Sequence, residues 1–247
     1  LGGVRVVKGA SPIEYGANTV GGVVDFRTRR DSGARFAHLE AGSLGSGSGS
    51  LVVTERIGAM NATLAAGGIT RDAEPLAGPL PFGQASGRRR TNTDLDATSL
   101  FAAIGTDAAP VGLRASLLHL AASRGIAPEG DRSADAGPRY WRYPRIRLTQ
   151  ATLGGSATVL GQARVRLVAW HQWFSQAIDQ YRDVAYTARR ARQEDQDHTL
   201  GGRLTLSHPA GPFSLRWAAS AQSSTHVGVE TALPSGTPGA RLRYRQN

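Results

Sequence analysis

The sequence predicts an all-β fold, an antiparallel sheet of about ten up-and-down strands that forms part of a transmembrane β-barrel. Three observations support this. From residue 35 onward, apolar and polar residues partly alternate in runs of roughly ten residues, the length of a barrel strand. The connections between these runs alternate between short and long. No apolar stretch approaches the ~20 residues of a spanning helix, so a membrane crossing would require a closed barrel.

The first 28 residues contain two strand-like runs, at 4–7 and 23–26, separated by a segment rich in glycine, proline and asparagine. Glycine and asparagine tolerate positive φ, and proline removes a backbone donor. We therefore expect the two runs to be joined by a compact connection that folds back on itself. A short polar hinge at 29–33 follows.

Within this opening segment, a series of residues follows in a characteristic order: Val4, Val6, Lys8-Gly9, Tyr15-Gly16, Gly21-Gly22-Val23-Val24 and Thr28. This order resembles the end of the plug domain of TonB-dependent outer-membrane receptors. The resemblance implies two domains, the end of a plug at 1–30 and an incomplete N-terminal portion of an outer-membrane barrel at 31–247. It also implies structural rather than ligand-binding roles for Lys8, Gly9, Tyr15, Gly16, Gly21 and Gly22.

The predicted strands are 35–43, 49–56, 60–70, 94–106, 111–123, 144–157, 163–174, 198–208, 213–224 and a tenth that begins near 241. The connections after the second, fourth, sixth and eighth strands are tight. Those after the third, fifth, seventh and ninth are long and polar, at 71–93, 124–143, 175–197 and 225–240. Outer-membrane barrels have this pattern, with brief periplasmic turns and long outer loops. The Ser/Gly tract at 43–48 is interpreted as a short outer loop, with a flexible linker as the alternative.

The alternation also predicts which side chains face lipid. In 213–221, Phe213, Leu215 and Trp217 share one face, and Arg216 lies on the other. An arginine facing lipid near the midplane costs ~2–4 kcal/mol, so the strand arginines should face the lumen. These are Arg164, Arg166, Arg203 and Arg216. A soluble β-sandwich would alternate in the same way, and the pattern of connection lengths favours the barrel.

Aromatic residues gather near predicted strand ends, which suits an interfacial girdle. They are Tyr140, Trp141 and Tyr143 before the sixth strand, and Trp170, Trp173 and Phe174 at the end of the seventh. Burial in an ordinary core is the alternative interpretation.

The composition and motifs predict no enzyme, no catalytic residue, no resident metal and no cofactor. The chain has no cysteine, and its six histidines are scattered, without the spacing of known catalytic or metal-binding motifs. The acidic stretch 194–198 could coordinate a cation, but a solvated loop is the simpler interpretation. The net charge of +10 raises nucleic acid as a partner. The arginines are dispersed, however, and no DNA-binding motif accompanies them, so no nucleic-acid partner is expected.

The resemblance implies uptake of a scarce solute across the outer membrane of Gram-negative bacteria. That solute would be a ferric siderophore, cobalamin or another metal complex. An energy-transducing TonB complex would act through a plug region preceding residue 1, and outer-membrane lipid and lipopolysaccharide would surround the barrel. Because arginine binds anionic groups by charge and fork geometry, ligand-binding candidates lie in the polar loops. They are Arg88, Arg89, Arg90, Arg139, Tyr140, Trp141 and Arg142. For the arginine triplet, binding of outer-leaflet lipid phosphates, or of no ligand at all, is the alternative.

Two other functions remain open at this stage. A passive porin shares the strand pattern but has no plug, and ten strands closing alone would leave a lumen little wider than side chains can fill. A secreted β-sheet binding module would be freely soluble.

Overall fold

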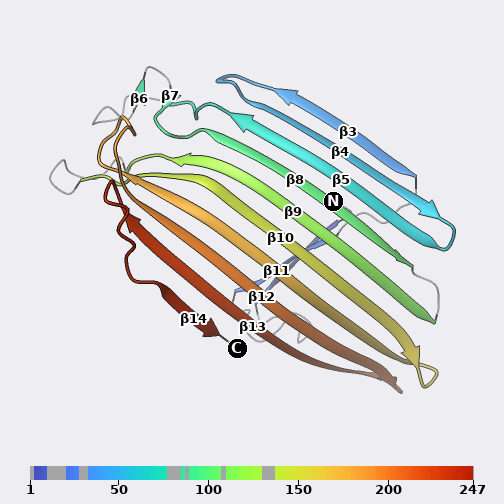
Figure 1. Ribbon diagram of the computed structural model, residues 1–247. Coiled ribbons are helices and arrows are strands. Elements are labelled where there is room, and N and C mark those ends of the chain that lie inside the picture. Colours follow the sequence, from blue (N-terminus) through green and yellow to red (C-terminus); the bar gives the residue numbers. More distant parts are fainter. Residues whose placement is uncertain are drawn as a thin grey trace.

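The computed structural model describes residues 3–9, 21–27, 33–76, 85–86, 89–106, 110–129 and 137–246. Within these ranges, every regular element is a β-strand, and no helix is long and apolar enough to cross a membrane. Ten strands form one antiparallel sheet, and their order across the sheet follows their order along the chain (Figure 1). The predicted all-β, up-and-down architecture is therefore confirmed.

The ten strands are β3 (Ala34–Ala41), β4 (Gly47–Ile57), β5 (Met60–Arg71), β8 (Leu95–Thr106), β9 (Val111–Ile126), β10 (Tyr140–Val159), β11 (Ala163–Tyr181), β12 (Arg189–Ala210), β13 (Phe213–Ala232) and β14 (Leu242–Gln246). Two short strands, β6 (Ala85–Ser86) and β7 (Arg89–Arg90), pair with each other inside the connection between β5 and β8.

The opening segment forms its own two-stranded sheet. β1 (Gly3–Lys8) pairs antiparallel with β2 (Gly22–Arg27), and the strands are not part of the ten-stranded sheet. Gly22 has φ +134°, and a Cβ there would lie 2.3 Å from the carbonyl oxygen of Val7. Only glycine fits this close approach. Tyr15 and Gly16, which belong to the same motif, lie outside the described residues.

Tight turns and long connections lie at opposite ends of the sheet. The tight-turn end, at the lower right of Figure 1, includes Gly58–Ala59, Leu160–Gln162 and Gly211–Pro212. At the long-connection end, the amide of Asp72 donates to the carbonyl of Leu44 at 3.1 Å, which ties the first connection to the next long one. Residues 47 and 48 of the Ser/Gly tract belong to β4. The tract is therefore a short connection between two paired strands rather than a flexible linker, and its position on the outer side stays a prediction.

Four strands extend much further than predicted. β10, β11, β12 and β13 have 20, 19, 22 and 20 residues, so most of 175–197 and part of 225–240 are strand rather than loop. The acidic stretch 194–198 lies within β12, so its interpretation as a loop is wrong. The sequence pattern fails here because polar residues occupy both faces of the extended strands, and a period of two cannot be read from them.

The strand register gives the sheet one apolar and one polar face. Leu167 pairs with Leu204, and the next pairs on that face are Val165 with Leu206 and Leu206 with Trp217. We call this the apolar face; the side chain of Trp217 is 65% exposed on it. The polar face, displaced by one residue, carries all four arginines predicted to share a face: Arg164, Arg166, Arg203 and Arg216.

The aromatic residues near the end of the seventh predicted strand divide between the two faces. Trp173 lies on the apolar face, where its ring is 3.8 Å from that of His171. Trp170 and Phe174 are an odd number of residues away from Trp173, so they lie on the polar face. A girdle made of all three is therefore wrong. Trp170 instead covers Gly201, where a Cβ would lie 2.3 Å from the indole ring.

Candidate functional site

The candidate ligand-binding residues gather at the long-connection end of the sheet. Arg89 and Arg90 form β7, and Tyr140, Trp141 and Arg142 begin β10. The two groups are far apart in the sequence, but the segment that follows β7 binds directly to the start of β10. Arg88 lies outside the described residues.

Asn92 is the residue that connects these two groups. Its side-chain amide donates to the carbonyls of Ile126 and Trp141 at 2.6 and 2.7 Å, and its amide oxygen accepts from Arg142 at 2.7 Å. Asn92 has φ +54°, a left-handed conformation that asparagine tolerates better than most residues. A Cβ at Gly125 would lie 2.4 Å from the same amide oxygen, so glycine at 125 leaves room for this contact.

Arg142 also forms a two-pronged ion pair with Asp94. Its two terminal nitrogens donate to the two carboxylate oxygens at 2.9 and 2.5 Å. Paired bonds of this kind fix the plane of the guanidinium as well as neutralising it. Arg142 therefore holds β10 to the segment before β8.

Arg139 is engaged in a similar way with Glu129. Both the backbone amide and the side chain of Arg139 donate to this carboxylate, at 2.7 and 2.5 Å. The backbone N–H bond, together with the adjacent guanidinium, lowers the pKa of Glu129 to about 2. The guanidinium of Arg139 also lies 4.9 Å from the ring centroid of Trp141. This ion pair and the cation–π contact brace the base of the loop between β9 and β10.

Three tyrosines form an aromatic cluster beside Asn92. The ring of Tyr186 meets those of Tyr140 and Tyr181 edge to face, with centroids 5.9 and 5.3 Å apart. Burial raises the pKa of the Tyr186 hydroxyl to about 12, because the charged phenolate would be poorly solvated there. The cluster ties the connection between β11 and β12 to the start of β10.

Arg89 and Arg90, which lie in the connection between β5 and β8, are held less tightly than Arg139 and Arg142. The backbone amide of Arg90 donates to the carbonyl of Glu74 at 2.9 Å, and its guanidinium lies 3.9 Å from the same residue's carboxylate. Thr93, a buried residue, donates its hydroxyl to the carbonyl of Arg90 at 2.9 Å. The side chain of Arg89 is exposed. Arg89 and Arg139 are the exposed arginines among the described candidates, and Arg139 is already paired with Glu129.

A network that the sequence did not reveal lies along the extended parts of β11, β12 and β13. The carboxylate of Asp179, 4% exposed, accepts from Arg192 at 2.7 and 3.0 Å and from Arg189 at 3.4 Å. Asp195, also buried, accepts from Gln176 at 2.9 Å and from Gln193. The mixed signs of charge between 189 and 198 were the available signal. Within the described ranges, no group of three acidic or histidine side chains is arranged to hold a metal ion.

A basic hollow occupies the polar face near the tight-turn end. Its volume is about 370 Å³, and it is lined by three arginines, Arg114, Arg164 and Arg166. Hydroxyl groups surround them, from Thr106, Ser116, Thr152, Ser156, Thr205 and Ser207. A hollow with this lining favours an anionic group.

Comparison with solved structures identifies the fold. No family model and no curated protein matches the sequence. The structure matches the copper transporter OprC with a TM-score of 0.75 and 14% identity over 94% of this chain. It matches the siderophore receptor PiuA from Acinetobacter baumannii with a TM-score of 0.62 and 13% identity over 97%, and the ferric yersiniabactin uptake receptor FyuA from Yersinia pestis with 0.58 and 12% over 98%.

All three matching proteins are TonB-dependent receptors. The chain spans 35%, 37% and 48% of their respective lengths. The ten-stranded sheet with its separate β1–β2 hairpin thus has the fold of part of such a receptor. The resemblance seen in the opening motif is confirmed at the level of the fold.

Proposed function

We propose that this chain is the end of the plug and the first part of the barrel of a TonB-dependent outer-membrane receptor that takes up a scarce solute. The observation that carries the proposal is the contrast between the two faces of one continuous up-and-down sheet. A face rich in exposed leucine, valine and tryptophan suits lipid, and a face rich in arginine and hydroxyl groups suits a hydrated lumen. A ferric siderophore is our first choice of solute, with cobalamin or another metal complex as alternatives.

The choice of solute rests on charge and on the matching structures. One of these is named a siderophore receptor, one a ferric yersiniabactin uptake receptor and one a copper transporter. The basic hollow around Arg164 and Arg166 would attract an anionic complex that passes along the wall. Energy would come from the TonB complex, which we expect to bind the plug by strand addition.

The contacts of the candidate residues support two different roles, solute binding and loop positioning. Arg88, Arg89 and Arg90 would contact the solute, because Arg89 is exposed and Arg90 is bound only loosely. Arg139 and Arg142, each neutralised by a carboxylate, would position the loops with Tyr140 and Trp141. Arg89→Gln in the full receptor should therefore weaken binding of an anionic ferric siderophore without changing loop structure. Arg142→Gln should change both, as read from tryptophan fluorescence.

Lipopolysaccharide would surround the long-connection end. Thr149 pairs with Trp173, and Arg147 pairs with Ser175. Arg147 therefore lies on the apolar face, one residue pair beyond Trp173 toward the long connections. An arginine just beyond an interfacial tryptophan suits the phosphate groups of outer-leaflet lipid.

Uptake by bacteria that carry the complete gene tests the function. Deletion should abolish growth on one defined ferric siderophore, and a proton uncoupler should abolish uptake by the intact receptor. Flux insensitive to the uncoupler would favour a passive porin. The protein should also fractionate with outer membranes and show heat-modifiable migration on a gel, whereas a freely soluble monomer would favour a secreted binding module.

A further inference from the structure

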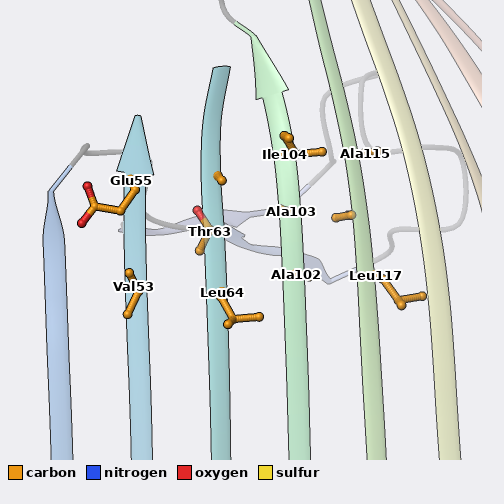
Figure 2. A pocket seen from close by; sticks show the side chains of 11 residues that line it. Val53, Glu55, Thr63, Leu64, Ala102, Ala103, Ile104, Ala115 and Leu117 are labelled. Atoms are coloured by element: carbon orange, nitrogen blue, oxygen red, sulfur yellow. The ribbon is translucent and has the colours of Figure 1, made fainter. Parts of the chain in front are cut away.

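The apolar face contains a hollow near its tight-turn end, shown in Figure 2. Its volume is about 560 Å³, within the range of typical small-molecule pockets. Two adjacent rows of side chains line it across four strands. One row is Val53, Leu64, Ala102 and Leu117, and the other is Glu55, Ala62, Ile104 and Ala115.

The hollow exists because small and large residues alternate along these rows. Ala102 lies between Leu64 and Leu117, and Ala62 and Ala115 lie on either side of Ile104. The alanines form the floor, and the branched side chains form the walls. The result is an apolar depression, suited to a hydrocarbon chain, in a face that is otherwise lined by projecting side chains.

A charged pair stands beside this depression, on the same apolar face. Arg35 pairs in register with Val53, and its guanidinium donates two bonds to Glu55 Oε1, at 2.9 and 2.6 Å. The Arg35 side chain is 74% exposed and that of Glu55 is 39% exposed. Charges on a lipid-facing surface are costly unless they reach the headgroup region. Both residues lie close to the tight-turn end, where Arg35 is the second residue of β3 and Glu55 precedes the end of β4 by two residues.

We propose that this hollow and the Arg35–Glu55 pair form a binding site for one phospholipid with a zwitterionic amine headgroup. An acyl chain would lie over Ala62, Ala102 and Ala115. The lipid phosphate would accept from Arg35, and the ammonium group would donate to Glu55 Oε2, which has no bond to another described residue. The site combines an apolar slot with a cation and an anion side by side. These charges are opposite in sign to the phosphate and ammonium groups of such a headgroup.

This inference rests on the proposed membrane location. The experiment therefore uses the full receptor, first shown to be a folded barrel by heat-modifiable migration, which tests the location separately. The purified receptor in mild detergent is titrated with phosphatidylethanolamine or phosphatidylglycerol, and native mass spectrometry counts the retained lipids. We expect one phosphatidylethanolamine to be retained with a preference of roughly fivefold, the contribution of an exposed charge pair.

Variants separate the headgroup from the hollow. Glu55→Gln should remove the preference for phosphatidylethanolamine, because the ammonium group of this lipid loses its carboxylate partner. Retention of phosphatidylglycerol, which has no ammonium group, should not fall. Ala102→Leu or Ala115→Leu should reduce retention of both lipids by filling the slot. Ala169→Leu is the matched control, since Ala169 lies on the apolar face of β11 outside the hollow, and it should change nothing.

Two results would overturn the site while leaving the receptor function intact. One is equal retention of the two lipids by the folded wild-type barrel. The other is an equal effect of Ala102→Leu and Ala169→Leu, which would show that lipid covers the whole face without a preferred position.

Discussion

The two ends of the sheet are built on different physical principles. Toward the tight turns, neighbouring residues differ sharply: Val165 and Leu167 lie on one face, and Arg164 and Arg166 on the other. Toward the long connections, both faces are polar, and Asp179 on one face and Asp195 on the other are both buried among hydrogen-bond donors. Under the proposed function, lipid on one face and a hydrated lumen on the other dictate the sequence of the first region. In the second region, specific side-chain pairs hold the strands.

This contrast explains how a sheet can extend well past the part that alternates. A strand between lipid and a hydrated lumen must separate its side chains by polarity. A strand with water on both sides gains nothing from that separation. Cross-strand ion pairs and amide contacts, such as Arg192 with Asp179, then contribute to pairing.

The largest expected effect is from a charge placed on the apolar face. Leu167→Arg exposes an arginine where Leu204 and Gly155 are its neighbours in register, with no acidic partner among them. We expect a loss of ~2–4 kcal/mol in folding free energy in lipid vesicles and little receptor in the outer membrane. Denaturant titration in vesicles and heat-modifiable migration measure this.

Gln172→Arg on the same strand provides the control. Gln172 pairs with Gln150 and Thr199 on the polar face, so the new charge would stay hydrated. Equal destabilisation by the two variants would mean that the faces do not meet different solvents, and the contrast described above would fail.

Alternation was sufficient to predict the tight-turn region from the sequence. Its strand boundaries agree closely with the structure; β11 begins at Ala163 and β13 at Phe213, as expected. The shared face of Arg164, Arg166, Arg203 and Arg216 also followed directly. A period of two is a local signal, because it depends only on neighbouring residues along one strand and not on distant partners.

The long-connection end was only partly predictable for the opposite reason. Arg139 and Arg142 were singled out as arginines near a loop, but their partners Glu129 and Asp94 could not be identified from spacing. Arg142 and Asp94 are 48 residues apart. Whether Asp94 meets Arg142 depends on the register of β8, β9 and β10, and Asn92 bonds to both β9 and β10 there.

The second prediction tests whether buried ion pairs stabilise the long-connection end. Asp179→Asn should cost ~1–3 kcal/mol, because Arg189 and Arg192 lose their charged partner and remain close together. Hydrogen exchange should increase in the connection between β11 and β12 and remain unchanged near Leu167.

Glu194→Gln is the matched control. Glu194 pairs with Arg145 at 3.0 Å, but it is 51% exposed, so its loss should cost less than ~1 kcal/mol. If the two variants were equally mild, burial would add nothing to these pairs.

A third, smaller effect concerns the point where the two regions meet. Gly201→Ala places a Cβ against the ring of Trp170, which must rotate or shift, at a cost of about 1 kcal/mol. Gly202→Ala is next to it on the other face, where the Cβ would meet only the carbonyl of Val168 at 3.7 Å. Near-ultraviolet circular dichroism should change in the first variant only, and a change in both would argue against the role of the indole ring.

The smallest effect is a pH dependence confined to the loop between β9 and β10. The pKa of Glu129 is lowered from 4.5 to about 2, so its carboxylate stabilises the folded loop above pH 4.5 and loses that contribution as the pH falls toward 2. Arg139 is 53% exposed, which limits the effect to less than ~1 kcal/mol.

Tryptophan fluorescence measured from pH 5 down to pH 2 tests this, because Arg139 lies over Trp141. The wild-type signal should change between pH 4.5 and 2, and Glu129→Gln should already show the low-pH signal at pH 5. Since glutamine keeps the size of the side chain but cannot bear the charge, a variant indistinguishable from wild type across this range would mean that the backbone bonds alone brace the loop. The long-connection end would then depend less on charge than the comparison of the two regions requires.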